Sequence, residues 1–315
     1  MRPSARPLGT TGPRPRDIVA ERRAMAGKSS KRGPDTNKYV VEIGGEYAGW
    51  LADVSGATAC GDMETGPRGR IRNRRDEIAC ACWPAMPRPF FAWIERSFGE
   101  AVRGTDGSIA LVDPDGNLLS QMLFQEGVVT GLHVPGHDRT TREAAKLGIK
   151  FSPGGVQQSY RRAQRVPPEI NAERSPRPAH DLRLDIDGLA EECSFVRRFE
   201  AMSVVQSISA RPGEGLVRSR PVAATPLKIT LPESKARGFV QWYERVPRGA
   251  ASQRTATLTL GAPEVGFSVV LHHLRLVKLT YEEATLDGEG PSRLRRDAKV
   301  EMIATTVDFC FLPGK

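Results

Sequence analysis

A ten-residue stretch of this chain returns, in closely related form, 149 positions later. Pro89–Phe98 reads Pro-Phe-Phe-Ala-Trp-Ile-Glu-Arg-Ser-Phe, and Gly238–Pro247 reads Gly-Phe-Val-Gln-Trp-Tyr-Glu-Arg-Val-Pro. Both copies carry an aromatic residue shortly before a tryptophan, and an acidic–basic pair after it. This pattern predicts a short amphipathic helix with one large apolar anchor, Trp93 or Trp242.

Five blocks of the two halves match in the same order, and the shifts between blocks fall in stretches that read as loops. This order favours a duplicated domain over chance similarity. The matched blocks and their offsets are 42–45 with 185–188 (143), 78–82 with 227–231 (149), the two Trp helices (149), 123–129 with 271–277 (148), and 145–147 with 298–300 (153).

The chain length of 315 residues also favours two domains, of roughly 130 to 150 residues each. The first half shows strand-like alternation, turns at Gly44-Gly45 and Asp113-Pro-Asp-Gly116, and one helix, and the stretch from Leu182 restarts this series of elements. We therefore predict a mainly β (α+β) protein with two tandem antiparallel domains. The expected boundaries are 38–153 and 182–315, joined by a Pro- and Arg-rich linker at 154–181.

The first residues carry much of the net charge of +9. Residues 1–37 are rich in Pro, Gly, Ser and Arg and hold few large apolar side chains, so we predict a disordered basic arm. An alternative is that Met25 is the true start. Neither a secretory signal nor an apolar run long enough to cross a membrane is present, so we expect assembly in the cytoplasm and no membrane insertion.

Five cysteines are an odd number, which fits reduced thiols better than a disulfide framework. Cys80 and Cys82 match Ile229 and Leu231 in the second half, which indicates that these positions need apolar side chains. We interpret all four as core anchors, together with the two tryptophans. We expect neither a metal nor a cofactor.

The sequence contains no nucleophile elbow, phosphate loop or paired-histidine helix, so we do not expect an enzyme. His272 and His273 match Phe124 and Gln125, so these two positions do not require a histidine side chain in both halves. A hydrolase that uses Asp138 with His133 or His137 is a minor alternative.

An exposed loop is predicted over 63–75, and it contains five arginines. They are candidate interface or phosphate contacts. With the basic arm, they support an alternative function as a nucleic-acid-binding protein. Aromatic residues make up only 6% of the chain and are not interleaved with the arginine runs, which argues against base stacking. The five are Arg68, Arg70, Arg72, Arg74 and Arg75.

The order of hairpin, strand, Trp helix, hairpin and closing strand resembles the tail-tube family. This family includes contractile-phage tail tubes, the type VI secretion tube (haemolysin-coregulated protein) and the tubes of extracellular injection systems. The matching pieces are Gly49-Trp-Leu-Ala-Asp-Val-Ser-Gly56, Trp93 after the strand at 78–82, and Leu276-Val-Lys-Leu-Thr-Tyr-Glu282. The resemblance covers roughly 38–152 and 182–312.

The resemblance implies that each half is a small β-barrel with one flanking helix, and that six such domains form a ring. It implies a trimer with pseudo-sixfold symmetry, or a hexamer, with other tube, sheath or baseplate proteins as partners. The location would be a virion tail or an injection-system particle. Two domains in one chain point to a specialised tube subunit, a hub or an adaptor. Arg211-Pro-Gly-Glu-Gly and Arg218-Ser-Arg220 distinguish the second half, so we expect the halves to face different neighbours.

Overall fold

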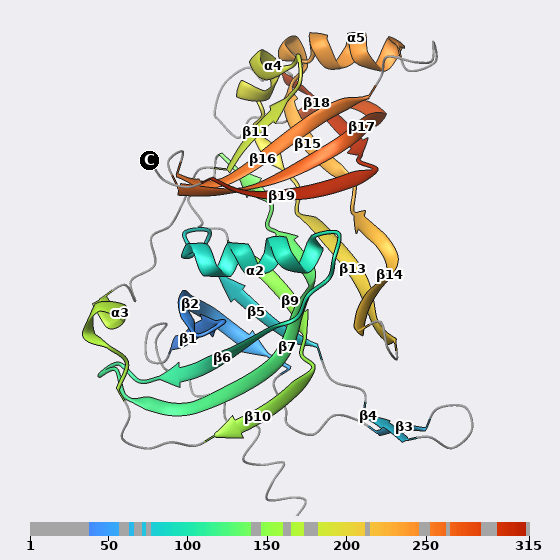
Figure 1. The fold of residues 1–315 in the computed structure, drawn as a ribbon. Coiled ribbons are helices and arrows are strands. Elements are labelled where there is room, and N and C mark those ends of the chain that lie inside the picture. Colours follow the sequence, from blue (N-terminus) through green and yellow to red (C-terminus); the bar gives the residue numbers. More distant parts are fainter. Residues whose placement is uncertain are drawn as a thin grey trace, which may run out of the picture. The chain divides into compact units, whose positions relative to one another are not determined.

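The computed structural model describes the part of the chain from residue 38 to residue 312, with gaps. The unit Asn37–Lys315 is compact and mainly β (Figure 1). The predicted basic arm lies outside the described residues. These are 38–56, 63–65, 71–73, 77–139, 146–159, 165–172, 182–211, 215–245, 253–262, 265–284 and 295–312.

Six antiparallel strands of the first half close into a barrel. They pair in the order β7, β6, β1, β2, β5 and β9, and β9 pairs back with β7. In β5, burial alternates so that Ile78, Cys80 and Cys82 point inward, as expected for a sheet with one apolar face. The strands are β1 (Lys38–Ile43), β2 (Glu46–Ser55), β5 (Ile78–Cys82), β6 (Thr105–Val112), β7 (Leu118–Val134) and β9 (Leu147–Ser152).

The second half forms a half-barrel sheet in the order β11, β16, β17, β18, β15 and β12. No described strand joins β12 back to β11, so this sheet stays open. Leu227, Ile229 and Leu231 are buried in β15, with the same alternation as in β5. The strands are β11 (Leu182–Ile186), β12 (Arg198–Phe199), β15 (Leu227–Pro232), β16 (Arg254–Ala262), β17 (Val265–Ala284), β18 (Arg295–Ile303) and β19 (Thr306–Leu312), which pairs with β17.

One long strand organises each sheet. The N-terminal part of β7 pairs with β6 and β10 (Gly155–Ser159), and its C-terminal part pairs with β9. In the same way, the N-terminal part of β17 pairs with β16 and β19, and its C-terminal part pairs with β18. Where the partners change, Glu126 and His273 have φ angles of 49° and 52°. They are the only non-glycine residues with positive φ in the described part of the chain. Because this conformation is uncommon outside glycine, it marks the same bend in both strands.

The hydrogen-bonded ladders allow the two halves to be compared residue by residue. Gly107 pairs with Ile43 and Phe124, and Ala256 pairs with Ile186 and Leu271. Likewise, Cys80 pairs with Ile149, and Ile229 pairs with Val300. We call two residues that share a place in this way counterparts.

For the strand blocks, these ladders agree with the predicted offsets of 143 and 149 and differ from the other two. β7 and β17 are offset by 147 residues rather than 148, and β9 and β18 by 151 rather than 153. The reason is that register depends on bulges and loop lengths, which residue similarity does not reveal. In this comparison His272 and His273 are the counterparts of Gln125 and Glu126, one position from the predicted match to Phe124 and Gln125.

The two sheets exchange strands. The hairpin of β13 (Met202–Arg211) and β14 (Gly215–Ala224) follows β12 in sequence, but it extends the first sheet by pairing with β7. In return, β8 (His137–Asp138) comes from the first half and pairs with β12. One apolar core therefore continues from the barrel into the half-barrel.

Two helices carry the tryptophans. α2 (Arg88–Phe98) has a proline in its first turn and ends at Gly99, and α5 (Arg237–Arg245) follows a short 3₁₀ turn. Two five-residue helices, α3 (Pro168–Ala172) and α4 (Ala190–Ser194), add to the one helix predicted per half. No helix in the described residues is long and apolar enough to span a membrane.

Two stretches predicted as irregular contain ordered elements. β10 and α3 lie within the expected linker, and Trp50 Nε1–H donates to the carbonyl oxygen of Ile170 in α3 at 3.0 Å. β3 (Met63–Thr65) and β4 (Ile71–Asn73) pair as a small hairpin within the expected loop.

Candidate interaction surfaces

One face of α2, which carries Phe90, Trp93 and Ser97, closes the interior of the barrel, and we call it the first face. The Trp93 ring contacts Phe124 of β7 and Phe151 of β9, with ring centroids 5.9 and 5.1 Å apart. Its indole N–H donates to the carbonyl oxygen of Gly127 at 2.8 Å, so the buried polar atom has a partner. Ser97 Oγ accepts from the Val129 amide at 3.0 Å. This face fixes the helix on the barrel.

The second face of α2 packs against the other sheet. Phe91, Ile94 and Phe98 follow helical spacing and are all buried. Phe91 stacks on Phe267 of β17, and Phe98 lies against Phe309 of β19, each with centroids 4.7 Å apart. α2 lies between the barrel strands and β19 (Figure 1). The helix is therefore the apolar centre of the junction between the halves.

On α5, only the face that corresponds to the first face of α2 is buried. Phe239 and Trp242 are buried, like their counterparts on α2, and the Arg254 guanidinium lies 5.1 Å from the Trp242 ring. Tyr243, the counterpart of Ile94, is 44% exposed, whereas Ile94 is 0% exposed. The outer face of α5 thus presents an apolar residue where α2 has a packed one.

The β13–β14 hairpin holds the C-terminal end of α2. Gln206 Nε2–H donates to the carbonyl oxygens of Ser97 and Val129 at 2.7 and 2.6 Å. Arg218 donates to the carbonyl oxygens of Phe98 and Gly99, both at 2.8 Å. The last carbonyls of a helix lack partners within the helix and carry partial negative charge, so a guanidinium suits them.

Arg218 and Gln206 also bind each other, because Arg218 Nε–H donates to Gln206 Oε1 at 2.9 Å. Burial lowers the pKa of the Arg218 guanidinium below its usual value, although arginine remains charged in proteins. We call Gln206 and Arg218 the α2 clamp. Sequence analysis noted Arg218-Ser-Arg220 only as a difference between the halves, since nothing in the sequence indicates that the hairpin crosses to the first sheet.

The predicted anchors all lie in the interior. Trp93 and Trp242 are buried on α2 and α5. Cys80 and Cys82 on β5, and their counterparts Ile229 and Leu231 on β15, point inward. Burial raises the pKa of the Cys80 thiol to about 12, and burial together with Cys80 raises the pKa of Cys82. Both thiols stay protonated near neutral pH, and the described residues contain no cluster of metal-ligating side chains.

The candidate arginines are only partly placed. Arg72 lies in β4, and the other four of the five predicted contacts lie outside the described residues. The nucleic-acid alternative therefore stays a prediction.

The histidines of the minor hydrolase alternative fall in different ladders. His133 Nδ1 lies 3.0 Å from Ser203 Oγ, across the pairing of β7 with β13. His137 and Asp138 form β8, which pairs with Phe199 and Arg198 of β12. These contacts accompany the strand exchange between the two halves.

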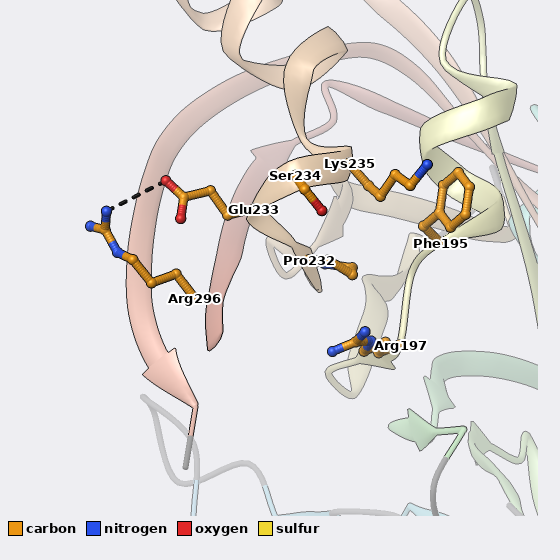
Figure 2. Close-up of a pocket in the computed structure, with 7 residues that line it drawn as sticks. All are labelled: Phe195, Arg197, Pro232, Glu233, Ser234, Lys235 and Arg296. Atoms are coloured by element: carbon orange, nitrogen blue, oxygen red, sulfur yellow. Dashed lines mark hydrogen bonds and ion pairs between the residues drawn. The ribbon is translucent and has the colours of Figure 1, made fainter. Parts of the chain in front are cut away.

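Figure 2 shows an open cavity of about 370 Å³ beside the 3₁₀ turn before α5. Three cations line it, and each has a partner. Arg197 pairs with Asp297 at 3.3 Å, Arg296 pairs with Glu233 at 3.5 Å, and the Lys235 ammonium lies 4.2 Å from the centre of the Phe195 ring. The cavity is thus a polar groove whose charges are already matched.

Comparison of the chain with protein-family models and with curated proteins finds no match.

Proposed function

We propose that this chain is a structural, ring-forming subunit of a phage-tail-like or contractile injection tube, or of its hub or adaptor. It acts by self-association and not by catalysis. The proposal combines the sequence resemblance to tail tubes with the geometry of the junction between the two halves.

The matched ladders support an internal duplication. Both halves carry the same series of strand, Trp helix, hairpin and closing strand, in the same pairing register. Glu126 and His273 share an uncommon backbone conformation at counterpart positions, which residue composition alone does not require. A repeated domain is the simplest source of two such sheets in one chain.

One observation carries the proposal: α2 is buried on two faces, and its counterpart α5 is buried on one. Inside the chain, the second face of α2 packs on the sheet of the following half. The outer face of α5 would pack in the same way on the first half of another copy. The chain therefore has two unlike ends that complete one another.

Contacts of this head-to-tail kind generate a ring when the rotation between neighbours closes. Two similar halves per chain turn three chains into a pseudo-sixfold ring, and six chains into a larger one. Partners among other tube, sheath or baseplate proteins, and a place in a virion tail or injection particle, follow from the resemblance.

Electron microscopy of the purified full chain tests this proposal. We expect closed rings or stacked tubes, with two similar densities per chain around the ring. A compact single-chain particle at high protein concentration would contradict it.

A further inference from the structure

An open cavity of about 450 Å³ lies at the bend of β17 in the second half. Three segments form its wall: the turn that follows β11, the residues at the start of β16, and the bend itself. A cavity of this volume is large enough for a small ligand. The residues that line it include Asp187, Gly188, Gln253, Arg254, His272 and His273.

The bend brings two neighbouring imidazoles to the same cavity. Successive side chains of a regular strand point to opposite faces of the sheet. His273 has a φ angle of 52°, which breaks this alternation, and both His272 and His273 line the cavity. Glycine adopts such an angle readily, whereas other residues are strained in it, and strained residues cluster at ligand sites. His273 is therefore a candidate ligand contact.

The Arg254 guanidinium is held in the cavity wall from three sides. It donates to the carbonyl oxygen of Asp187 and lies 5.1 Å from the centre of the Trp242 ring. Gly188, with a φ angle of 70°, leaves room for it, because an added Cβ there would lie 2.6 Å from Arg254 Nη1. The cation is thus positioned before any ligand binds.

No carboxylate in the described part of the chain forms an ion pair with Arg254. Its described partners are one neutral carbonyl oxygen and one aromatic ring. A guanidinium has five N–H donors in a rigid fork that matches the two oxygens of a carboxylate. Arg254 therefore has donors left for an anionic ligand.

Gln253 fixes the proton of the neutral His273 ring. We orient the Gln253 amide from its hydrogen-bond partners, so that its oxygen accepts from Arg275 Nε and Nη2 at 3.0 and 2.6 Å. The amide N–H then donates to His273 Nδ1 at 2.9 Å. A neutral imidazole carries one proton, which must then be on Nε2. His273 is therefore a second oriented donor in the cavity wall.

The corresponding place in the first half has different chemistry. Thr105 and Glu126 are the counterparts of Arg254 and His273 in the ladders of β6 with β7 and of β16 with β17. There, Asp106 Oδ1 accepts from the Glu126 amide at 2.8 Å. The same bend is thus built around acidic side chains, so the fold itself does not require Arg254 or His273 at this place.

The charges around the cavity favour a ligand with one negative charge. Arg254 supplies one positive charge, and Asp187 is the one carboxylate among the lining residues. Asp308 Oδ2 lies 3.0 Å from His272 Nε2, so that imidazole already has an anionic partner. These two carboxylates oppose each added negative charge, which disfavours a doubly charged phosphate relative to a carboxylate.

We propose that this cavity binds the carboxylate group of a small organic acid. Arg254 donates to both oxygens of the carboxylate, and the Nε2–H of His273 donates to one of them. This inference goes beyond the structural function proposed above and does not depend on ring formation.

Saturation-transfer difference NMR of benzoate with the full chain tests this proposal, because the ligand is detected whatever the size of the assembly. We expect a signal that saturates with benzoate concentration and that acetate displaces. Neither sodium chloride nor inorganic phosphate at equal ionic strength should displace it. A signal that never saturates, or that phosphate displaces as well as acetate does, would overturn the proposal.

Two variants locate the site. Arg254→Gln should weaken benzoate binding about tenfold or more, because it removes the charge-assisted hydrogen bonds. His273→Gly removes the second donor and also relieves the strained φ angle. It should therefore bind benzoate more weakly than the parent does, while its melting temperature is no lower. Unchanged binding in either variant would place benzoate elsewhere and overturn the assignment.

The matched control is Glu126→Gly, which relaxes the same bend in the first half. We expect this variant to bind benzoate as the parent does. Circular dichroism of all three variants checks that the fold is kept, and His273→Gly still tests the site if Arg254→Gln does not fold. Equal weakening by Glu126→Gly and His273→Gly would show that the bend, and not the His273 donor, is responsible, and would contradict the proposal.

Discussion

α2 and α5 hold the same place in the two halves but differ in what surrounds them. α2 buries Phe90 and Trp93 in the barrel and Phe91 and Phe98 against the second sheet, whereas α5 buries only the equivalents of the first pair. The second face of α2 is thus covered within the chain, whereas Tyr243 on the corresponding face of α5 is exposed. The proposed head-to-tail assembly would cover that face with another copy.

The two sheets differ in a related way. β2 is a ten-residue strand that closes the first barrel, but its counterpart β12 has two residues, after which the chain leaves for the other half as β13. In the second half, the stretch between β11 and β12 contains α4 instead of a long strand like β2, and the half-barrel stays open.

The largest expected effect comes from removing the helix anchors. Trp93→Ala and Trp242→Ala should each lower the free energy of unfolding by about 3–5 kcal/mol, because each leaves a large cavity. Trp93→Ala also leaves the carbonyl oxygen of Gly127 without its indole donor. Urea unfolding measures both. A loss below about 1 kcal/mol at either site would show that the helix is not an anchor there.

Alanine substitutions on the second face of α2 and on the corresponding face of α5 should lower the free energy of unfolding by unequal amounts. Phe91→Ala removes a stacked ring from the completed junction and should cost about 3–5 kcal/mol in the free energy of unfolding. Val240→Ala, its counterpart on α5, should cost under about 1 kcal/mol in the dilute single chain, because this side chain is only partly buried. Equal losses in chemical denaturation would break the comparison between α2 and α5.

The α2 clamp gives a smaller effect. Arg218→Ala leaves the carbonyl oxygens of Phe98 and Gly99 without their donor and should destabilise the fold by about 1–3 kcal/mol. Arg220→Ala on the same strand is exposed and should change stability by less than about 0.5 kcal/mol. Thermal melting compares them, and a silent Arg218→Ala would argue against the clamp.

The last effect concerns pH and is absent near neutral pH. The folded-state pKa of Cys80 is raised from 9.0 to about 12, so its contribution to stability is intact below pH 9 and falls as the pH rises toward 12, where only the unfolded thiol ionises. The loss is about 1.4 kcal/mol per pH unit in this window. Cys80→Ala should show a shallower decline between pH 9 and 11 in urea unfolding, and an unchanged slope would contradict the burial of the thiol.

Elements built from large apolar side chains could be predicted from sequence. The Trp helices, the alternating strands of Cys80 and Ile229, and the turn at Gly44-Gly45 depend on local patterns, and the structure has them at the predicted places. Ladder partners could not be predicted, because backbone groups pair without a residue signature. For this reason the docking of β13 on β7 escaped prediction, as did the true register of β17, which contains a bulge near Val277.

The mass of the full chain in solution tests the central claim most directly. Light scattering over a concentration series should show particles at whole multiples of 34.5 kDa, with a three-chain ring dominant at high concentration. A single species of 34.5 kDa at every concentration would contradict head-to-tail assembly.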